Sequence, residues 1–321
     1  MHSGKSLLAL LVLFLSIACG QALAWNSIGH MTVAFAAYQQ LSPTEKARVA
    51  ALLKLNPFYD KWLKMIPAGT SAADQDMYVF LMAATWPDEI RANDSGFSGN
   101  DDAPKGESPS LNDGYDAKQR HEYWHFIDTP ISADGTKLPP VPEPTIVEKI
   151  AAFRADLATS ESDALKSYDL VWLIHLTGDV HQPLHCVTRI SKAKPHGDLG
   201  GNLIRVDGPS KNLHAFWDDL LGTGDTQNFM KAVAAGATLP APDPTLAADD
   251  KEADWAKESA ALAQSDVYVA PVADGLGPYN LAGAYTKNAQ QIARQRISLA
   301  GARLANLLKT ALNCSAQTCA N

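Results

Sequence analysis

The stretch Leu-Val-Trp-Leu-Ile-His-Leu-Thr-Gly-Asp-Val, residues 170–180, places one histidine and one aspartate in a mostly apolar run. His175 and Asp179 are four residues apart, so in a helix both side chains lie on one face and can bind one metal ion. A single histidine on an apolar helix is more often a core residue with satisfied hydrogen bonds. A buried carboxylate without a partner is strongly disfavoured, however, so we expect a cation beside Asp179.

The same spacing recurs farther along the chain. His185 follows just past Pro183, and His214 and Asp218 are again four residues apart in a second helical stretch. Two such pairs in one chain favour a metal cluster over two unrelated core histidines. Imidazole nitrogen and carboxylate oxygen without thiolate suit catalytic zinc that keeps open positions for water.

Three further segments contain the same residue types. The run His-Glu-Tyr-Trp-His-Phe-Ile-Asp at 121–128 carries two histidines and two carboxylates, and Thr-Trp-Pro-Asp at 85–88 ends an apolar helix with an acid. Trp25 precedes His30 by five residues. If Trp25 became the first residue of the mature protein, its free amine would join these candidate ligands.

Residues 1–24 have the layout of a secretory signal peptide, with Lys5 near the start, an apolar run over 7–18 and the ending Ala-Leu-Ala. About a dozen apolar residues are too few to span a bilayer, which needs ~20. We therefore predict cleavage after Ala24, a secreted or periplasmic protein, and Trp25 as its first residue.

The cysteines bear on processing and on disulfides. A lipoprotein signal would cut before Cys19, but Ser16 stands where a leucine is expected. Three cysteines remain in the mature chain, too few to hold a fold of this size together. Cys314 and Cys319 could close a short terminal loop, which would leave Cys186 unpaired and buried.

The charge of the chain limits its partners. The full sequence carries a net charge of −8, and removal of the leader takes away Lys5 and no acidic residue, which leaves 26 basic against 35 acidic side chains. Such a protein has no overall attraction for nucleic acid or an anionic membrane. A polyanionic substrate must therefore be held by a local positive centre, such as bound metal. The sequence indicates no stable protein partner.

Helical patterns dominate the mature chain. Residues 27–40 read as one helix, and Ser42 and Glu45 form a capping box that opens another. Over 282–312 the apolar positions keep a period of 3.6 residues, which predicts a long terminal helix. The fold is therefore expected to be mainly α, a multi-helix bundle.

Long polar segments rich in glycine and proline separate the helices and are expected to be loops: 93–116, 129–144, 191–212 and 240–249. A short β-hairpin over 202–206, turned at Asp207-Gly208, is the one β element expected. Candidate ligands lie on both sides of each of the first three loops. Residues 25–321 are therefore predicted to form a single domain.

Taken together, these motifs resemble those of the secreted, zinc-dependent, single-strand-specific nuclease family that includes mung bean nuclease, over nearly the whole mature length. Each motif alone is weak, but their order and spacing are highly specific. The markers are Trp-Asn-x-x-Gly-His at 25–30, Trp-Pro-Asp at 86–88, His-Phe-Ile-Asp at 125–128, the run from His175 to His185, Gly-Gly-Asn at 200–202 and Asn-Leu-His-x-x-x-Asp at 212–218.

The resemblance implies a site of three Zn²⁺ ions. Asp179 would bridge two of the ions. The implied ligands are Asp88, His125, His175 and Asp179 for one ion, His185, His214 and Asp218 for another, and the amine and carbonyl of Trp25 with His30 and Asp179 for the third.

The resemblance also implies roles in catalysis. Asp128 would orient or deprotonate the attacking water, and Arg91, where relatives often have lysine, would neutralise charge on the phosphate. Phe126, with Asn202 and Asp198 nearby, would form a stacking surface for an unpaired base. The expected substrates are single-stranded DNA and RNA, cut at the 3′ oxygen to leave 5′ phosphates, and also 3′-nucleotides.

Several of these residues have simpler interpretations. Phe126 could belong to the core, Arg91 to a surface salt bridge, and Asn202 to a turn alone. The histidines not assigned to metal are His121 and His181, expected behind the ligands or at the surface, and His196, expected in a loop.

Two other functions remain open from the sequence. Zinc phospholipase C has a similar fold and a related three-zinc site, although the short spacing from Trp25 to His30 and an aspartate at 218 argue against it. A non-catalytic zinc-binding protein would need neither Asp128 nor Arg91.

Overall fold

The structure, a computed structural model, describes residues 25–98, 108, 111–132, 134–141, 143–192 and 194–312. The predicted signal peptide and the Cys314–Cys319 pair lie outside the described residues. Cys186 is buried, as predicted, and forms no disulfide with another described residue. None of the helices formed by the described part of the chain is long and apolar enough to cross a membrane.

The described residues are mainly helical, which confirms the predicted fold class. The α-helices are α1 (Ser27–Tyr38), α2 (Pro43–Leu53), α3 (Tyr59–Met65), α4 (Ala72–Ala83), α5 (Trp86–Glu89), α6 (Ile146–Thr159), α7 (Asp163–Asp179), α8 (Leu213–Asp218), α9 (Phe229–Gly236), α10 (Pro244–Ala247), α11 (Glu252–Leu262) and α12 (Ala284–Ala311). Short 3-10 turns are η1 (Tyr115–Ala117), η2 (Glu122–His125), η3 (Pro183–Cys186) and η4 (Thr226–Asn228), and one π-helical turn is η5 (Ala263–Val267).

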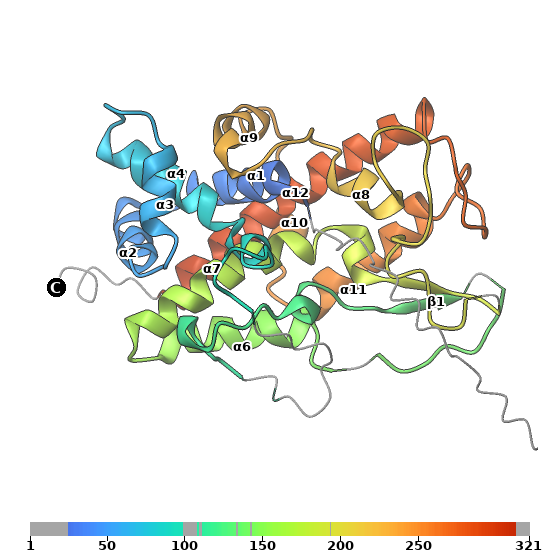
Figure 1. Cartoon of the computed structure of the whole chain (residues 1–321), viewed down its shortest axis with the longest axis horizontal. Helices are drawn as coiled ribbons and strands as arrows, with labels where there is room; N and C mark the ends of the chain where they lie inside the picture. Colours follow the sequence, from blue (N-terminus) through green and yellow to red (C-terminus); the bar gives the residue numbers. More distant parts are fainter. Residues whose placement is uncertain are drawn as a thin grey trace, which may run out of the picture.

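Helix α7 forms the centre of the molecule. It begins at Ser162, whose hydroxyl accepts a hydrogen bond from the Leu165 amide, and every residue from Ser167 through Ile190 is buried. In Figure 1, α6 lies below α7, and α1 and α12 lie above it. Because neighbours enclose α7, any charged side chain near its C-terminal end must find its partners inside the protein.

The predicted helix boundaries are largely confirmed. The Ser42–Glu45 capping box is present at the start of α2, and α12 spans 28 residues. Helix α12 packs closely on α1, since a Cβ at Gly301 would lie only 2.5 Å from the Cβ of Ala36. Close contact between these helices fixes the amino-terminal segment over the centre of the fold.

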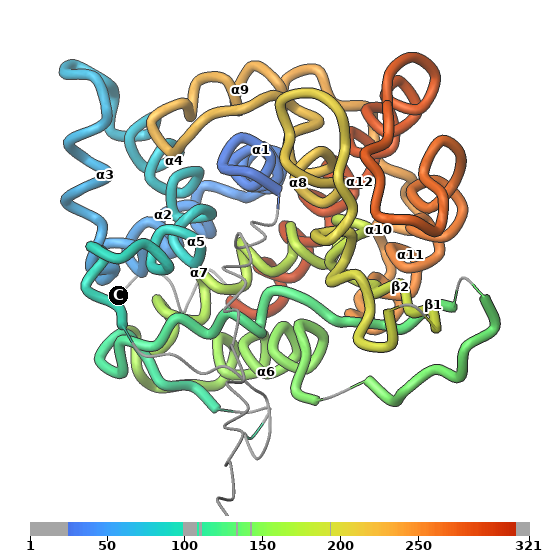
Figure 2. The backbone as a smooth tube through the Cα atoms, turned by 45° about the vertical axis from the view of Figure 1, so that its right-hand side comes forward, coloured from blue at the N-terminus to red at the C-terminus, as the bar shows by residue number. Residues whose placement is uncertain are grey.

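The β structure differs from the prediction. The strands are β1 (Pro130–Ser132) and β2 (Thr188–Ile190), which pair in parallel. The predicted hairpin over 202–206 is wrong, because this segment bonds instead to the distant loop 276–279, with an isolated bridge from Val206 to Tyr279. Figure 2 shows helices α2 to α5 on one side of the tube and β1, β2 and α11 on the other.

The loop predictions were partly wrong. The segments at 93–116, 129–144 and 240–249 contain part of η1, strand β1 and helix α10, respectively. Asp243 caps α10 by accepting from two main-chain amides, with Pro244 at the first helical position. This is a standard helix start that the polar composition of the segment obscured.

Candidate metal centre

Eight predicted ligands meet in three groups at the C-terminal end of α7. Within each group the candidate nitrogen and oxygen atoms lie within 4.8 Å of one another. The groups are His30, His175 and Asp179; Asp88, His125 and His175; and His185, His214 and Asp218. Helices α1, α5, α7 and α8 and the turns η2 and η3 supply them.

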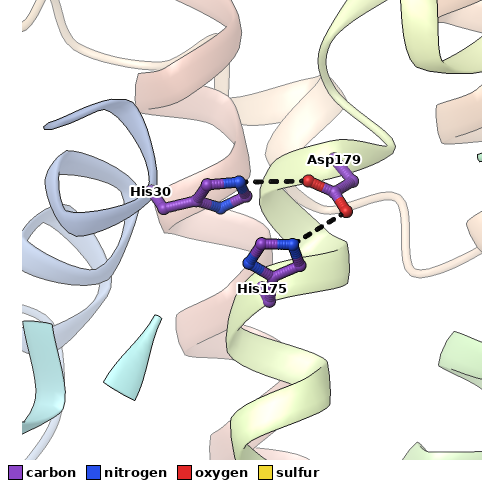
Figure 3. A group of neighbouring side chains, drawn as sticks. All are labelled: His30, His175 and Asp179. Atoms are coloured by element: carbon purple, nitrogen blue, oxygen red, sulfur yellow. Dashed lines mark ion pairs between the residues drawn. The ribbon is translucent and has the colours of Figure 1, made fainter. Parts of the chain in front are cut away.

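Asp179 lies between two sets of imidazoles. Its Oδ1 is 3.2 Å from His30 Nε2, while its Oδ2 is 3.2 Å from His175 Nε2 and 3.0 Å from His125 Nδ1. Figure 3 shows His30 from α1 and His175 from α7 converging on the two oxygens of this carboxylate. The His30 and His175 rings stack 3.9 Å apart. One carboxylate is thus placed to serve two neighbouring metal positions.

Asp88 completes the second group. Its Oδ1 lies 3.9 Å from His175 Nε2 and 4.0 Å from His125 Nδ1, and it also accepts a hydrogen bond from Arg91 at 3.2 Å. Asp88 lies in the short helix α5, which has Pro87 in its first turn. The distances leave room for a cation between the aspartate and the two imidazoles.

The third group shows most directly that the residues suit a metal. His185 Nδ1 and His214 Nδ1 each face a main-chain carbonyl at 2.7 Å, those of His125 and Gly200. A carbonyl oxygen only accepts, so both Nδ1 atoms carry hydrogen, and in a neutral ring the lone pair then lies at Nε2. These two Nε2 atoms are 3.0 Å apart. Two converging lone pairs repel each other unless a cation binds both.

Asp218 adds a carboxylate to this group. Its Oδ2 is 3.7 Å from His214 Nε2, while its Oδ1 accepts a hydrogen bond from Gln182 at 2.7 Å. Burial raises the pKa of Asp218 well above its ordinary value, and nearby Asp219 adds to the shift. A positive ion would offset this cost. Gln182 was not predicted, although its place in the run His-Gln-Pro-Leu-His before His185 was a usable signal.

The pKa of Asp179 is shifted in the opposite direction from that of Asp218. Burial alone would raise the pKa of Asp179, but the charge of His175 and hydrogen bonds from His125 and His175 hold it well below its usual range. Burial lowers the pKa of His125 to about 4. Asp179 is therefore ionised and His125 neutral at pH 7, the protonation states that metal ligands require.

Trp25 lies fully buried beside the first group, and its indole donates a hydrogen bond to the Gly178 carbonyl at 3.0 Å. Two glycines make room for this arrangement. A Cβ at Gly29 would lie 2.6 Å from the Cβ of Trp25, and one at Gly178 would lie 2.9 Å from His30 Nδ1. The main-chain amine and carbonyl of Trp25 as metal ligands remain a prediction.

The predicted catalytic residues lie around this centre. Arg91 is buried and bonded to Asp88, so it is not a surface salt-bridge residue. Burial raises the pKa of Asp128 to about 6, and the charge of nearby Asp198 contributes to the rise. Asp128 follows η2 at the start of the segment leading to β1.

The three predicted substrate residues differ in exposure. Phe126 is 38% exposed, so it does not belong to the core. Asn202 is half-buried and bonds within its turn, since its amide donates to the Leu199 carbonyl at 2.7 Å. Asp198 is fully buried. Of the three, only Phe126 presents a large free surface.

The remaining histidines stay outside the three groups. His121 stacks on Trp124 with ring centroids 3.4 Å apart, and His181 faces Arg303 at 2.9 Å. Both are buried, so the surface alternative is wrong for them. His196 is exposed in the loop before Gly197.

A family model described as S1/P1 Nuclease matches residues 25–313. Endonuclease 4 of Arabidopsis thaliana is 26% identical over 231 residues, which cover 65% of this chain and 59% of that protein. Endonuclease 3 of Arabidopsis thaliana is 40% identical over 72 residues, which cover 20% of this chain and 22% of that protein. The chain therefore matches less than two thirds of the length of either relative.

Proposed function

The chain belongs to the S1/P1 nuclease family and is a phosphodiester-cleaving hydrolase, and from this premise we propose that it is a secreted endonuclease with three zinc ions that cleaves single-stranded DNA and RNA. It would also act as a 3′-nucleotidase. The observation that carries the proposal is the convergence of imidazole nitrogens and carboxylate oxygens in three groups, two of which share His175.

The proposed ligand sets follow these groups. Asp88, His125, His175 and Asp179 would hold one zinc ion; His185, His214 and Asp218 a second; and Trp25, through its amine and carbonyl, with His30 and Asp179 a third. Bound zinc would supply positive charge for the phosphate and a water of lowered pKa. The three ions would bring six positive charges to an otherwise acidic protein, of which the three aspartates offset half.

Asp128 and Arg91 would act on the substrate itself. Asp128, with a pKa of about 6, is ionised at pH 7 and would orient the attacking water and accept its proton. The planar Arg91 guanidinium would donate hydrogen bonds to the phosphate oxygens as charge develops there. The water would attack phosphorus on the side opposite the 3′ oxygen. The bond between phosphorus and that oxygen would break, and the phosphate would stay on the 5′ oxygen.

Phe126 would give the preference for single strands. Its ring is 38% exposed beside His125, and a base stacked on it contributes ~1–3 kcal/mol whatever its identity. A base within a duplex is already stacked and paired, so it must first be extruded. Asn202 would contribute a polar contact at the edge of this surface.

Signal cleavage after Ala24 would complete the metal centre by freeing the amine of Trp25, which is consistent with export to the periplasm or outside the cell. The proposal predicts three zinc ions per mature chain. It also predicts 5′-phosphorylated products from single-stranded DNA and RNA, formed much faster than from duplex DNA, and phosphate release from a 3′-mononucleotide.

Metal analysis combined with product analysis tests the proposal. The Asp128→Ala variant is the matched control and should keep full zinc while losing hydrolysis. Cleavage of phosphatidylcholine in place of nucleic acid would assign the chain to the phospholipase C class. A fully metal-loaded wild type without hydrolytic activity would leave only a zinc-binding protein.

A further inference from the structure

The loop before α8 adopts an unusual backbone conformation. Gly197, Leu199, Gly200 and Gly201 all have positive φ, at 80°, 55°, 58° and 81°. Three of them are glycines, which adopt this conformation readily. Leu199 has a Cβ atom, which disfavours it. A non-glycine residue persists in the left-handed region only where its surroundings hold it there, and such residues cluster at functional sites.

The loop delivers one main-chain carbonyl to the metal centre. The Gly200 oxygen accepts the hydrogen bond from His214 Nδ1 at 2.7 Å. A Cβ at Gly200 would lie 2.3 Å from the Leu184 carbonyl oxygen and 3.2 Å from His214 Nδ1. Residue 200 therefore has no room for a side chain, and its carbonyl fixes which nitrogen of His214 faces His185.

The other side of the same peptide unit is held by Asp198. Its Oδ1 accepts a hydrogen bond from the Gly201 amide at 3.3 Å. The peptide that joins Gly200 to Gly201 is planar, so its N–H and C=O point in opposite directions. One peptide unit is thus clamped between the Asp198 carboxylate and the His214 imidazole.

Asp198 is in turn firmly positioned. Its Oδ1 also accepts from the Arg189 amide at 2.9 Å and from the Tyr268 hydroxyl at 3.1 Å. The Arg189 guanidinium lies 3.6 Å from Asp198 Oδ2, so its positive charge compensates the buried carboxylate. The same guanidinium lies over the Tyr268 ring, 4.5 Å from its centroid. Asp198 has no exposed surface.

We propose that Asp198 is a positioning residue, which orients His214 through the Gly200–Gly201 peptide and so sets the zinc affinity of the His185, His214 and Asp218 group. The carboxylate polarises the amide, which makes its carbonyl a stronger acceptor for His214. A carboxylate that supports a metal-bound histidine directly is a common arrangement, and here a peptide unit stands between them. The inference rests on the proposed function only in taking this group to bind zinc.

Two substitutions test it in the zinc-loaded protein. Asp198→Asn removes the charge, and Tyr268→Phe removes one hydroxyl that holds it while keeping the ring. Both are expected to weaken zinc binding at one site by ~10–100-fold, the usual cost of losing a partner behind a ligand. Competition with a chelator measures the affinity, and anomalous scattering from crystals identifies the emptied position. The other two zinc sites should keep their affinity.

Tyr115→Phe is the matched control, because its buried hydroxyl bonds to Asn56 and Ser167, away from the loop. It should lower thermal stability to a similar degree as Tyr268→Phe and leave all zinc affinities unchanged. If Tyr268→Phe and Asp198→Asn retain zinc as this control does, the inference is wrong.

The same measurements separate this inference from the proposed function. A higher KM for single-stranded DNA in Asp198→Asn with unchanged zinc affinity would make Asp198 a substrate contact and overturn the positioning role. A wild type without zinc at His185, His214 and Asp218 would remove the basis of both proposals. A wild type with zinc and hydrolysis, together with unaffected variants, would overturn the positioning role alone.

Discussion

Two aspartates on α7, ten residues apart and both fully buried, have opposite acid–base behaviour. Burial raises the pKa of Asp169 to about 8, with the charge of Asp156 adding to the shift, whereas the imidazoles around Asp179 hold its pKa well below the usual range. Asn112 donates a hydrogen bond to Asp169 Oδ1, and Asp169 Oδ2 has no hydrogen-bond partner among the described residues. The difference shows that surroundings, rather than depth, decide whether a buried carboxylate keeps its charge.

The largest effect on activity is expected from replacing Asp179, the aspartate that keeps its charge. Asp179→Asn takes away the carboxylate placed between His30 on one side and His125 and His175 on the other, so two zinc ions should be lost. A metal ion contributes several kcal/mol of transition-state stabilisation, so activity should fall on the order of a thousand-fold or more. Metal analysis and single-stranded DNA cleavage measure it. A variant that kept three zinc ions would contradict the bridging role.

A smaller effect is expected from one extra residue before Trp25, such as a retained methionine. An internal peptide nitrogen is a poor ligand, so the zinc ion proposed to bind Trp25, His30 and Asp179 should be bound less tightly. We expect the zinc affinity of this site to fall about 100-fold. This is at least the loss that follows when a group supporting a metal ligand is removed.

The same extended protein, cut by a protease to begin at Trp25, is the control and should recover three zinc ions. If the extended protein already has full zinc and full activity, the terminal amine is not a ligand, although the histidine and aspartate groups would stand.

Gly178→Ala, at the Asp179 end of α7, should lower zinc affinity less than the extra residue before Trp25 does. The new methyl group would lie 2.9 Å from His30 Nδ1, and His30 is fully buried and stacked on His175, so the ring must shift from its place beside Asp179 Oδ1. We expect about a ten-fold loss of zinc affinity at this position. The neighbouring Thr177→Ala is the control, because its hydroxyl bonds only to Leu173 within the helix. Equal zinc affinity in the two variants would show that His30 does not depend on the glycine.

The smallest effect on activity is expected at the other end of α7. Asp169 stays protonated in the folded protein up to pH 8, whereas in the unfolded chain it loses its proton near pH 4. Its contribution to stability is therefore present below pH 4 and declines as the pH rises toward 8. Asp169→Asn removes this decline and should be more stable than the wild type by on the order of a few kcal/mol at pH 8.

Urea unfolding of both proteins at pH 5 and pH 8 measures this difference, and DNA cleavage should be the same for both. The advantage of the variant should be clearly larger at pH 8. A constant difference between the two pH values would mean that Asp169 does not change its charge on unfolding.

Much of the candidate site could be predicted because its signals are local. The spacings His175 to Asp179 and His214 to Asp218 place two ligands on one helix face whatever the rest of the chain does. The Ser42–Glu45 capping box and the period of α12 are equally local, and both are present. The start of α10 at Asp243 is a local signal too, but the polar composition of residues 240–249 indicated a loop.

The errors concern contacts between distant segments. The pattern at 202–206 predicted pairing across a tight turn, but this segment pairs with residues near Tyr279, and β1 pairs with β2 more than 50 residues away. A short strand gains little stability from its own sequence. Its pairing partner therefore depends on which backbone segment the helices place beside it.

The sequence by itself determined the types of the candidate ligands, their helical spacing and the family, because residue identity and helix period are properties of short stretches. Only the tertiary structure decided that His175 belongs to two groups, that Gly178 makes room for His30, and that the Gly200 carbonyl selects which nitrogen of His214 faces His185. Each of these contacts joins segments that are far apart in the sequence, so no pattern within a short stretch marks it. They exist only once packing around α7 has brought the segments together.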